Sequence, residues 1–224
     1  MNISTDEKTF AKINDDRDEY RSVFRRQVFE LLKRGYDRLV SSKYKHVDEE
    51  IITGELGVSI QNIIEDRSSP SWAWQFAVHI ENPINSKKRK GKNRLRIDIE
   101  FERTGRGKHP RYPFEAKRLS SGTHATIGEY IGTDGLDQFL SGNYAKDNVE
   151  AGMLAYVQTE TPQHWALKTE KRFKKDANRL KIHLDDEWVP FVILPSFDHC
   201  YRSKHDRPVI KKPITIYHVF LSFC

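Results

Sequence analysis

The chain has 224 residues, enough for one domain with its own hydrophobic core, and 31% of them are charged against 37% that are hydrophobic. This balance is too apolar for a disordered chain and too polar for a membrane protein. The longest apolar run, Trp188 to Leu194, is far shorter than the ~20 residues of a membrane-spanning helix. Two cysteines cannot build a disulfide framework, and the first residues lack the pattern of a signal peptide. We therefore expect a soluble, cytoplasmic protein that does not enter a membrane.

Positive charge is unevenly distributed along the chain. The net charge is +6, the isoelectric point is near 9.2, and lysines and arginines concentrate in residues 87–96, 103–111 and 168–181. Such clusters are typical of proteins that bind a phosphate backbone, although each could also be an ordinary solvated surface. The candidate contacts to nucleic acid are Lys88, Arg89, Lys90, Lys92, Arg106, Lys108 and Arg111.

The first half of the chain predicts helices followed by strands. Apolar residues near a period of 3.6 predict helices over residues 16–42 and 48–66, after a polar, frayed start. Strands are predicted at 72–80, at 95–102, where apolar and charged residues alternate strictly, and at 111–119. Because the connections are short, we expect these three strands to form an antiparallel meander.

The second half is mixed. A short helix is predicted at 136–140, and residues 149–158 fit a helix or a strand equally well. Thr161-Pro162 predicts the start of a helix that reaches about residue 182. Strands are predicted at 188–194 and 214–223, with the polar segment 196–207 between them as a surface loop rather than a phosphate-binding strand. The element order predicts an α+β or mixed α/β fold in one domain, residues 1–224, with a helical N-terminal arm at 1–45 and a core at 48–220.

Two acidic residues and a lysine stand on the second and third predicted strands. If the turn is centred near Arg106-Gly107, antiparallel pairing places Asp98 opposite Glu115, with β-carbons ~5 Å apart, and Lys117 on the same face. A shifted register would instead place Glu100 opposite Glu115. Two carboxylates this close repel each other unless a cation lies between them.

A divalent metal would meet this requirement, because Mg²⁺ is usually held by one or two carboxylates together with water and substrate phosphate. The backbone carbonyl of Ala116 is a further candidate ligand. A metal and an ammonium group together would suit phosphodiester hydrolysis, since both offset the negative charge of the transition state. The alternative is a solvated, salt-bridged outer face of the sheet.

Helices followed by an antiparallel meander with Asp98 on its second strand and Glu115-Ala116-Lys117 on its third resemble the PD-(D/E)xK nuclease superfamily. The resemblance implies a restriction-endonuclease-like core, a central mixed sheet flanked by helices. It implies Asp98 and Glu115 as metal ligands, Lys117 as the catalytic lysine, and Mg²⁺ or Mn²⁺ as cofactor. The residue before Asp98 is isoleucine rather than the proline of the motif.

Many members of this superfamily also carry a glutamate on the first core helix near the metal. Glu49 is the candidate here, because it lies on the same helical face as Ile52 and Leu56; Glu55 is a further possibility. The Gly- and Tyr-rich segment 130–156 either packs in the core or forms one wall of a nucleic-acid cleft.

Taken together, the residues and the resemblance predict an Mg²⁺-dependent endonuclease that acts on DNA rather than RNA. The resemblance also implies a role in restriction or anti-phage defence, as a homodimer or as a subunit of a defence complex. Two other functions remain open. One is a catalytically inactive nucleic-acid-binding subunit, and the other is a structural or regulatory protein whose acidic strand face is merely solvated.

Overall fold

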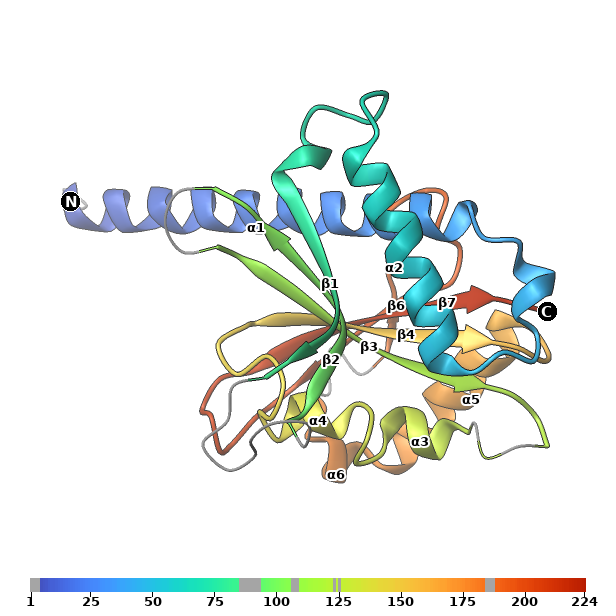
Figure 1. Cartoon of the computed structure of the whole chain (residues 1–224). Coiled ribbons are helices and arrows are strands. Elements are labelled where there is room, and N and C mark those ends of the chain that lie inside the picture. Colours follow the sequence, from blue (N-terminus) through green and yellow to red (C-terminus); the bar gives the residue numbers. More distant parts are fainter. Residues whose placement is uncertain (1–4, 85–93, 106–108, 123, 125, 184–187) are drawn as a thin grey trace.

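The computed structural model describes residues 5–84, 94–105, 109–122, 124, 126–183 and 188–224, with side chains from residue 17 onward. It is a mixed α and β fold with a seven-stranded sheet flanked by helices, as predicted (Figure 1). The strands are β1 (Phe76–Pro83), β2 (Arg96–Arg103), β3 (Arg111–Leu119), β4 (Glu150–Val157), β5 (Val189–Pro190), β6 (Cys200–His205) and β7 (Ile214–Ser222). The helices are α1 (Thr5–Asp37), α2 (Glu49–Glu65), α3 (Ile127–Ile131), α4 (Asp137–Leu140), α5 (Pro162–Lys175) and α6 (Ala177–Leu180), with short 3₁₀ turns η1 (Ser41–Tyr44) and η2 (Ala73–Gln75).

The strand order in the sheet is β1-β2-β3-β4-β7-β6-β5. The predicted antiparallel meander of β1, β2 and β3 is confirmed. From β3 the sheet continues through β4 and β7 in parallel, and β6 and β5 then close it in antiparallel pairing. The strand β3, which carries Glu115 and Lys117, therefore has an antiparallel neighbour on one side and a parallel neighbour on the other.

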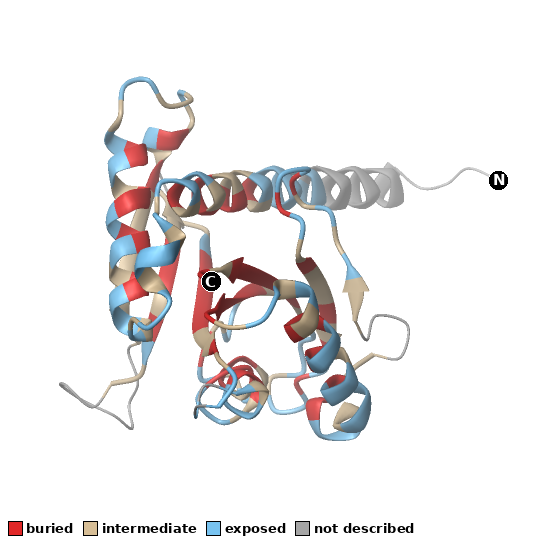
Figure 2. Cartoon of the chain, turned by 90° about the vertical axis from the view of Figure 1, so that its right-hand side faces the viewer, coloured by how far each residue is buried: buried red, intermediate tan, exposed pale blue. Residues whose placement is uncertain are grey.

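Helices cover both faces of the sheet. Helices α1 and α2 pack on one face through Phe29, Leu56 and Ile60, whereas α3 to α6 cover the other face and bury Tyr130 and Phe173. Figure 2 shows that the buried residues of α1 and α2 lie on the sides that face the sheet. Within the described ranges, no helix is both long and apolar enough to cross a bilayer.

Several predicted boundaries need correction. Helix α1 begins at Thr5 rather than near residue 16 and ends at Asp37, because acidic residues in a first turn favour a helix start even where no apolar period is present. The strand predicted from residue 72 begins at Phe76, since residues 73–75 form a 3₁₀ turn, and it continues to Pro83. The helix that starts at Pro162, capped by the Thr161 side chain as predicted, is interrupted at Asp176.

The C-terminal third departs most from the prediction. Residues 149–158, left open between helix and strand, contain strand β4, while the predicted strand 188–194 is reduced to two residues in β5. The predicted loop 196–207 contains strand β6. Ser203 and His205 are fully buried, so they are neither part of a surface loop nor accessible to a phosphate. Arg207 is also buried, and its guanidinium donates to three backbone carbonyls.

A chain of hydrogen bonds explains how these polar groups are buried. The imidazole Nδ1 of His205 lies 2.8 Å from the carbonyl oxygen of Leu180, so Nδ1 carries the proton and Nε2 accepts from Ser203 Oγ at 2.7 Å. The Ser203 oxygen then accepts from His218 Nε2 at 2.8 Å, and His218 Nδ1 accepts from the Tyr130 hydroxyl at 2.9 Å. Each group has one role, and both histidines are neutral.

Packing around the third strand yields a stability prediction. Gly152 of β4 lies opposite Phe114 of β3, and a methyl group at Gly152 would overlap the Phe114 ring. We expect Gly152→Ala to lower the free energy of unfolding by about 1–3 kcal/mol, because a fully buried ring must leave its position.

Urea denaturation of the two proteins measures this difference. Gly54→Ala in helix α2 is the matched control, since a methyl group there meets nothing within 4 Å. That change should stabilise the helix by about 1 kcal/mol. Equal stability of Gly152→Ala and the wild type would contradict the packing described for β3 and β4.

Candidate active site

The sheet register brings the two predicted acidic residues together. Strands β2 and β3 pair from Ile99–Phe114 to Glu102–Arg111, and extending this ladder by one residue places Asp98 opposite Glu115. The Asp98 carboxylate accepts a hydrogen bond from the backbone N–H of Ala116 at 2.7 Å. The alternative register that would pair Glu100 with Glu115 is wrong, because Glu100 lies opposite Pro113.

Lys117 connects three oxygen atoms from two elements. Its ammonium group donates to Glu115 Oε1 at 2.8 Å, to Glu49 Oε1 at 2.9 Å and to the carbonyl oxygen of Ala116 at 2.6 Å. The side chains of Glu115 and Lys117 are only 4% and 12% exposed. Charged groups are rarely buried to this degree unless they are paired.

Glu49 enters the cluster from the first turn of α2, as the helical face predicted. Its second carboxylate oxygen accepts from the backbone N–H of Arg118 at 2.9 Å, so both oxygens are bonded to strand β3. The neighbouring Asp48 forms an ion pair with Arg118 at 3.0 Å. Glu55, the other possibility, is exposed on α2.

The electrostatics of the cluster follow from burial and mutual proximity. Burial raises the pKa of Glu115 well above its ordinary value, and the charge of Asp98 raises it further. Burial raises the pKa of Asp98 to about 6, although Lys117 and the Ala116 N–H oppose this change. For Lys117, burial lowers the pKa, but Glu115, Glu49 and Asp98 outweigh burial and raise it. The three carboxylates therefore favour the charged ammonium form of Lys117.

The donor atoms suit a hard divalent cation. Glu115 Oε2 is buried and has no hydrogen-bond partner, which leaves an acceptor beside Asp98 and the Ala116 carbonyl without a donor. Two carboxylates and a carbonyl oxygen are a ligand set that Mg²⁺ accepts. Among the described residues, no cluster of three or more histidine, cysteine, aspartate and glutamate side chains has the geometry of a metal site.

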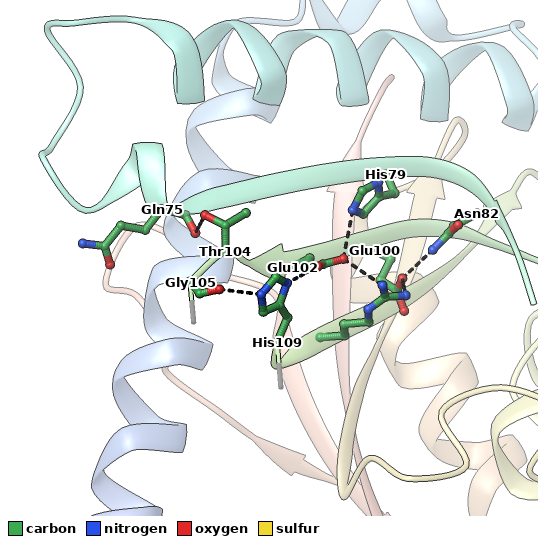
Figure 3. Close-up of polar contacts among 9 residues, drawn as sticks. Gln75, His79, Asn82, Glu100, Glu102, Thr104, Gly105 and His109 are labelled. Atoms are coloured by element: carbon green, nitrogen blue, oxygen red, sulfur yellow. Dashed lines mark hydrogen bonds and ion pairs between the residues drawn. The ribbon is translucent and has the colours of Figure 1, made fainter. Parts of the chain in front are cut away.

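The other acidic residues of β2 belong to a separate network at the far end of the hairpin (Figure 3). Glu100 accepts from Asn82 and Arg111, and Glu102 accepts from His79, His109 and Arg111. Of the predicted nucleic-acid contacts, Arg111 is thus already paired with two carboxylates. The others, Lys88, Arg89, Lys90, Lys92, Arg106 and Lys108, lie outside the described residues.

A cavity of about 570 Å³ opens beside Glu49. Its lining mixes the cationic and ionisable side chains Lys45, His46, Arg118 and His124 with the acids Asp48, Glu49, Glu50 and Glu129. Apart from Glu49, these residues were missed by the sequence analysis, because nothing in the sequence indicates that residues 45–50 fold against residues 118–129. The cationic ones could meet a phosphate-bearing ligand next to Glu49.

The tyrosines of segment 130–156 are packing residues. Tyr130, Tyr144 and Tyr156 are buried, so they do not form an exposed cleft wall. The Tyr156 hydroxyl is 3.1 Å from Thr53 Oγ1 and so links strand β4 to helix α2. Burial raises the pKa of Tyr144, and the charges of Glu115 and Asp98 add to the effect, which places its hydroxyl near the acidic cluster.

The arrangement thus combines two buried carboxylates, an ammonium group and a third carboxylate at the edge of a cavity with a mixed charged lining. Comparison with known proteins adds no family to this description: no protein-family model matches the chain, and neither a curated protein nor a solved structure matches it significantly.

Proposed function

We propose that this protein is a metal-dependent endonuclease of the PD-(D/E)xK type that hydrolyses phosphodiester bonds in DNA. The observation that carries the proposal is the meeting of Asp98, Glu115 and Lys117 on adjacent strands, with an unpartnered carboxylate oxygen of Glu115 in their midst. Asp98 and Glu115 are two carboxylates beside one ammonium group, that of Lys117, whereas a structural ion pair has one of each. Such clusters are typical of functional sites.

Mg²⁺ or Mn²⁺ would be held by Asp98, Glu115 and the carbonyl oxygen of Ala116, with Glu49 at its side. When bound, the metal would offset phosphate charge and lower the pKa of a coordinated water. Lys117 contributes a second positive charge, which the carboxylates of Glu115, Glu49 and Asp98 favour. Glu49 holds that ammonium group and the Arg118 backbone in place, which makes it a positioning residue as well as a candidate ligand.

The cavity beside Glu49 supports the choice of a phosphate-bearing substrate. Lys45 and His46 line it and would contact phosphates beside the bond to be cut, whereas Arg118 is paired with Asp48 and the acids Glu50 and Glu129 lie on the same wall. Because these contacts are electrostatic, DNA binding should weaken steeply as salt is added. A role in restriction or anti-phage defence, as a homodimer or within a larger complex, is part of the same proposal.

One observation favours the second candidate, a nucleic-acid-binding subunit without catalysis. The Lys117 ammonium already donates to Glu115 and to the Ala116 carbonyl, two of the groups that a metal would use. If this pairing persists in the presence of Mg²⁺, the protein would bind DNA and leave it intact.

Cleavage assays decide between the two. Supercoiled plasmid, single-stranded DNA and RNA are incubated with the protein in Mg²⁺, Mn²⁺ or EDTA, and binding is measured separately in Ca²⁺. We expect metal-dependent nicking that falls by about 100-fold or more in Asp98→Asn and Lys117→Ala, with binding retained. Unchanged cleavage in either variant would refute the proposed site.

A further inference from the structure

A second cavity, of about 1130 Å³, lies beneath α1 at the beginning of strand β3. Its walls come from α1, from the ends of β2 and β3, from residues 147–150 and from Lys212. Asp98, Glu115, Lys117 and Glu49 are not among its lining residues. The volume is slightly above the ~300–1,000 Å³ typical of pockets that hold small organic ligands, so a ligand of that size fits.

One wall of this cavity is aromatic. Tyr20 and Phe24 of α1 are stacked one turn apart, with ring planes 8° from parallel and centroids 6.4 Å apart, and Tyr112 lies below them. The Arg103 guanidinium lies over the Tyr20 ring, 5.6 Å from its centroid, but Tyr20 is still 45% exposed, so part of the side chain is accessible to a ligand. Exposed aromatic rings of this kind stack on planar heterocycles.

The opposite wall carries a histidine whose charge follows from its contacts (Figure 3). His109 Nδ1 lies 2.6 Å from Glu102 Oε1, and Nε2 lies 2.7 Å from the carbonyl oxygen of Gly105. Both partners can only accept hydrogen bonds, so both ring nitrogens must carry protons and the ring is an imidazolium. The hydrogen bond to Glu102 accordingly raises the pKa of His109.

The remaining charges make the cavity attractive to an anion. Its cationic side chains are Arg17, Arg21, His109, Arg111 and Lys212, against the acids Glu102, Asp147 and Glu150. Most of these charges are already paired: Glu102 with Arg111 and His109, Glu150 with Arg25 at 2.7 Å, and Arg21 with Asp18 at 2.9 Å. Within the described part of the chain, Arg17 and Lys212 have no ion-pair partner.

We propose that this cavity is a binding site for a free nucleotide, separate from the Asp98–Glu115–Lys117 cluster. The base stacks on Tyr20, and the phosphates lie between Arg17 and Lys212. A planar ring with an attached polyanion is the ligand that fits a cavity lined both by an exposed aromatic ring, Tyr20, and by the cations Arg17 and Lys212.

The test is isothermal titration calorimetry of the full chain in EDTA with ATP and GTP in turn, and with tripolyphosphate and adenosine as partial ligands. We expect saturable binding of at least one nucleotide. Tripolyphosphate and adenosine should each bind at least about tenfold more weakly than that nucleotide. Arg17→Glu, Lys212→Glu and Tyr20→Ala should each weaken nucleotide binding by about tenfold. Lys171→Glu is the matched control, because it reverses an exposed charge on α5, which covers the other face of the sheet.

One further result separates this site from the proposed nuclease. Asp98→Asn should bind nucleotide as the wild type does, so that loss of cleavage and loss of nucleotide binding are independent outcomes. The proposal is overturned if neither nucleotide binds, if tripolyphosphate binds as tightly as the nucleotides, or if Lys171→Glu weakens binding as much as Arg17→Glu.

Discussion

Replacing Lys117 with methionine should lower the free energy of unfolding by about 3–5 kcal/mol near neutral pH, as expected when one partner of a buried ion pair is removed. The methionine fills a similar volume but leaves Glu115, which is 4% exposed, without the one cation that bonds to it among the described residues. Glu49 and the Ala116 carbonyl also lose a donor. Urea denaturation followed by tryptophan fluorescence measures the loss.

The double variant Lys117→Met/Glu115→Gln provides the control. Because the glutamine is neutral, it removes the uncompensated charge, and we expect it to recover about half or more of the lost stability. If the single lysine variant is as stable as the wild type, the buried cluster does not exist as described.

The pH dependence of the Lys117→Met loss has a definite sign. An acid whose pKa is raised by folding, such as Asp98 at about 6, destabilises the folded state above that pH, and the penalty disappears as pH falls toward the unfolded value. Glu115 follows the same direction, since burial raises its pKa also. The stability deficit of Lys117→Met should therefore shrink on acidification from about pH 7 to about pH 5.

Through the buried histidines, acid should lower the free energy of unfolding, which is opposite to its effect through Asp98 and Glu115. Burial lowers the pKa of His205 to about 4 and lowers that of His218 still more clearly. A base whose pKa is lowered by folding contributes stability that is complete above its unfolded pKa and is lost as pH falls toward the folded pKa. For His205 we expect about 3 kcal/mol to be lost between about pH 6.5 and about pH 4.

The variant His205→Gln isolates this contribution. Glutamine has no titrating group in this range, so the stability of the variant should fall less with acid than that of the wild type. The difference between the two proteins, measured by urea denaturation across the range, cancels the effects of Asp98 and Glu115, which both proteins share. If the free energies of unfolding of the two proteins fall in parallel as the pH falls, His205 does not have the lowered pKa that its burial implies.

Local patterns were sufficient to predict the strands that carry the acidic pair. The strict alternation of β2 and the short connection to β3 leave few possible registers, so Asp98 and Glu115 could be paired from the sequence. Glu49 was identified because the buried face of α2 follows from its apolar period. Each of these inferences uses residues within one element or one hairpin.

The errors arose where burial depends on partners far away in the chain. The sequence of strand β6 is polar and therefore predicts a loop. Its Ser203 and His205 can be buried because they form hydrogen bonds to each other, to His218 and to the Leu180 carbonyl. The residues near β6 in the sequence do not indicate these hydrogen-bond partners. In the same way, the bond from Lys117 to Glu49 joins residues 68 positions apart, and the cavity beside Glu49 joins two segments that are no closer in sequence.

The most direct test of the proposed activity compares the rate of plasmid nicking in Mg²⁺ for the wild type and Glu115→Gln. Glu170→Gln on α5 is the control, since it also neutralises one glutamate of an ion pair, but on an exposed helix surface. The proposal predicts nicking by the wild type and by Glu170→Gln that EDTA abolishes, and a rate about 100-fold or more lower for Glu115→Gln. A wild type that binds the plasmid in Ca²⁺ but leaves it uncut in Mg²⁺ and Mn²⁺, or a Glu115→Gln variant that cuts equally fast, would contradict it.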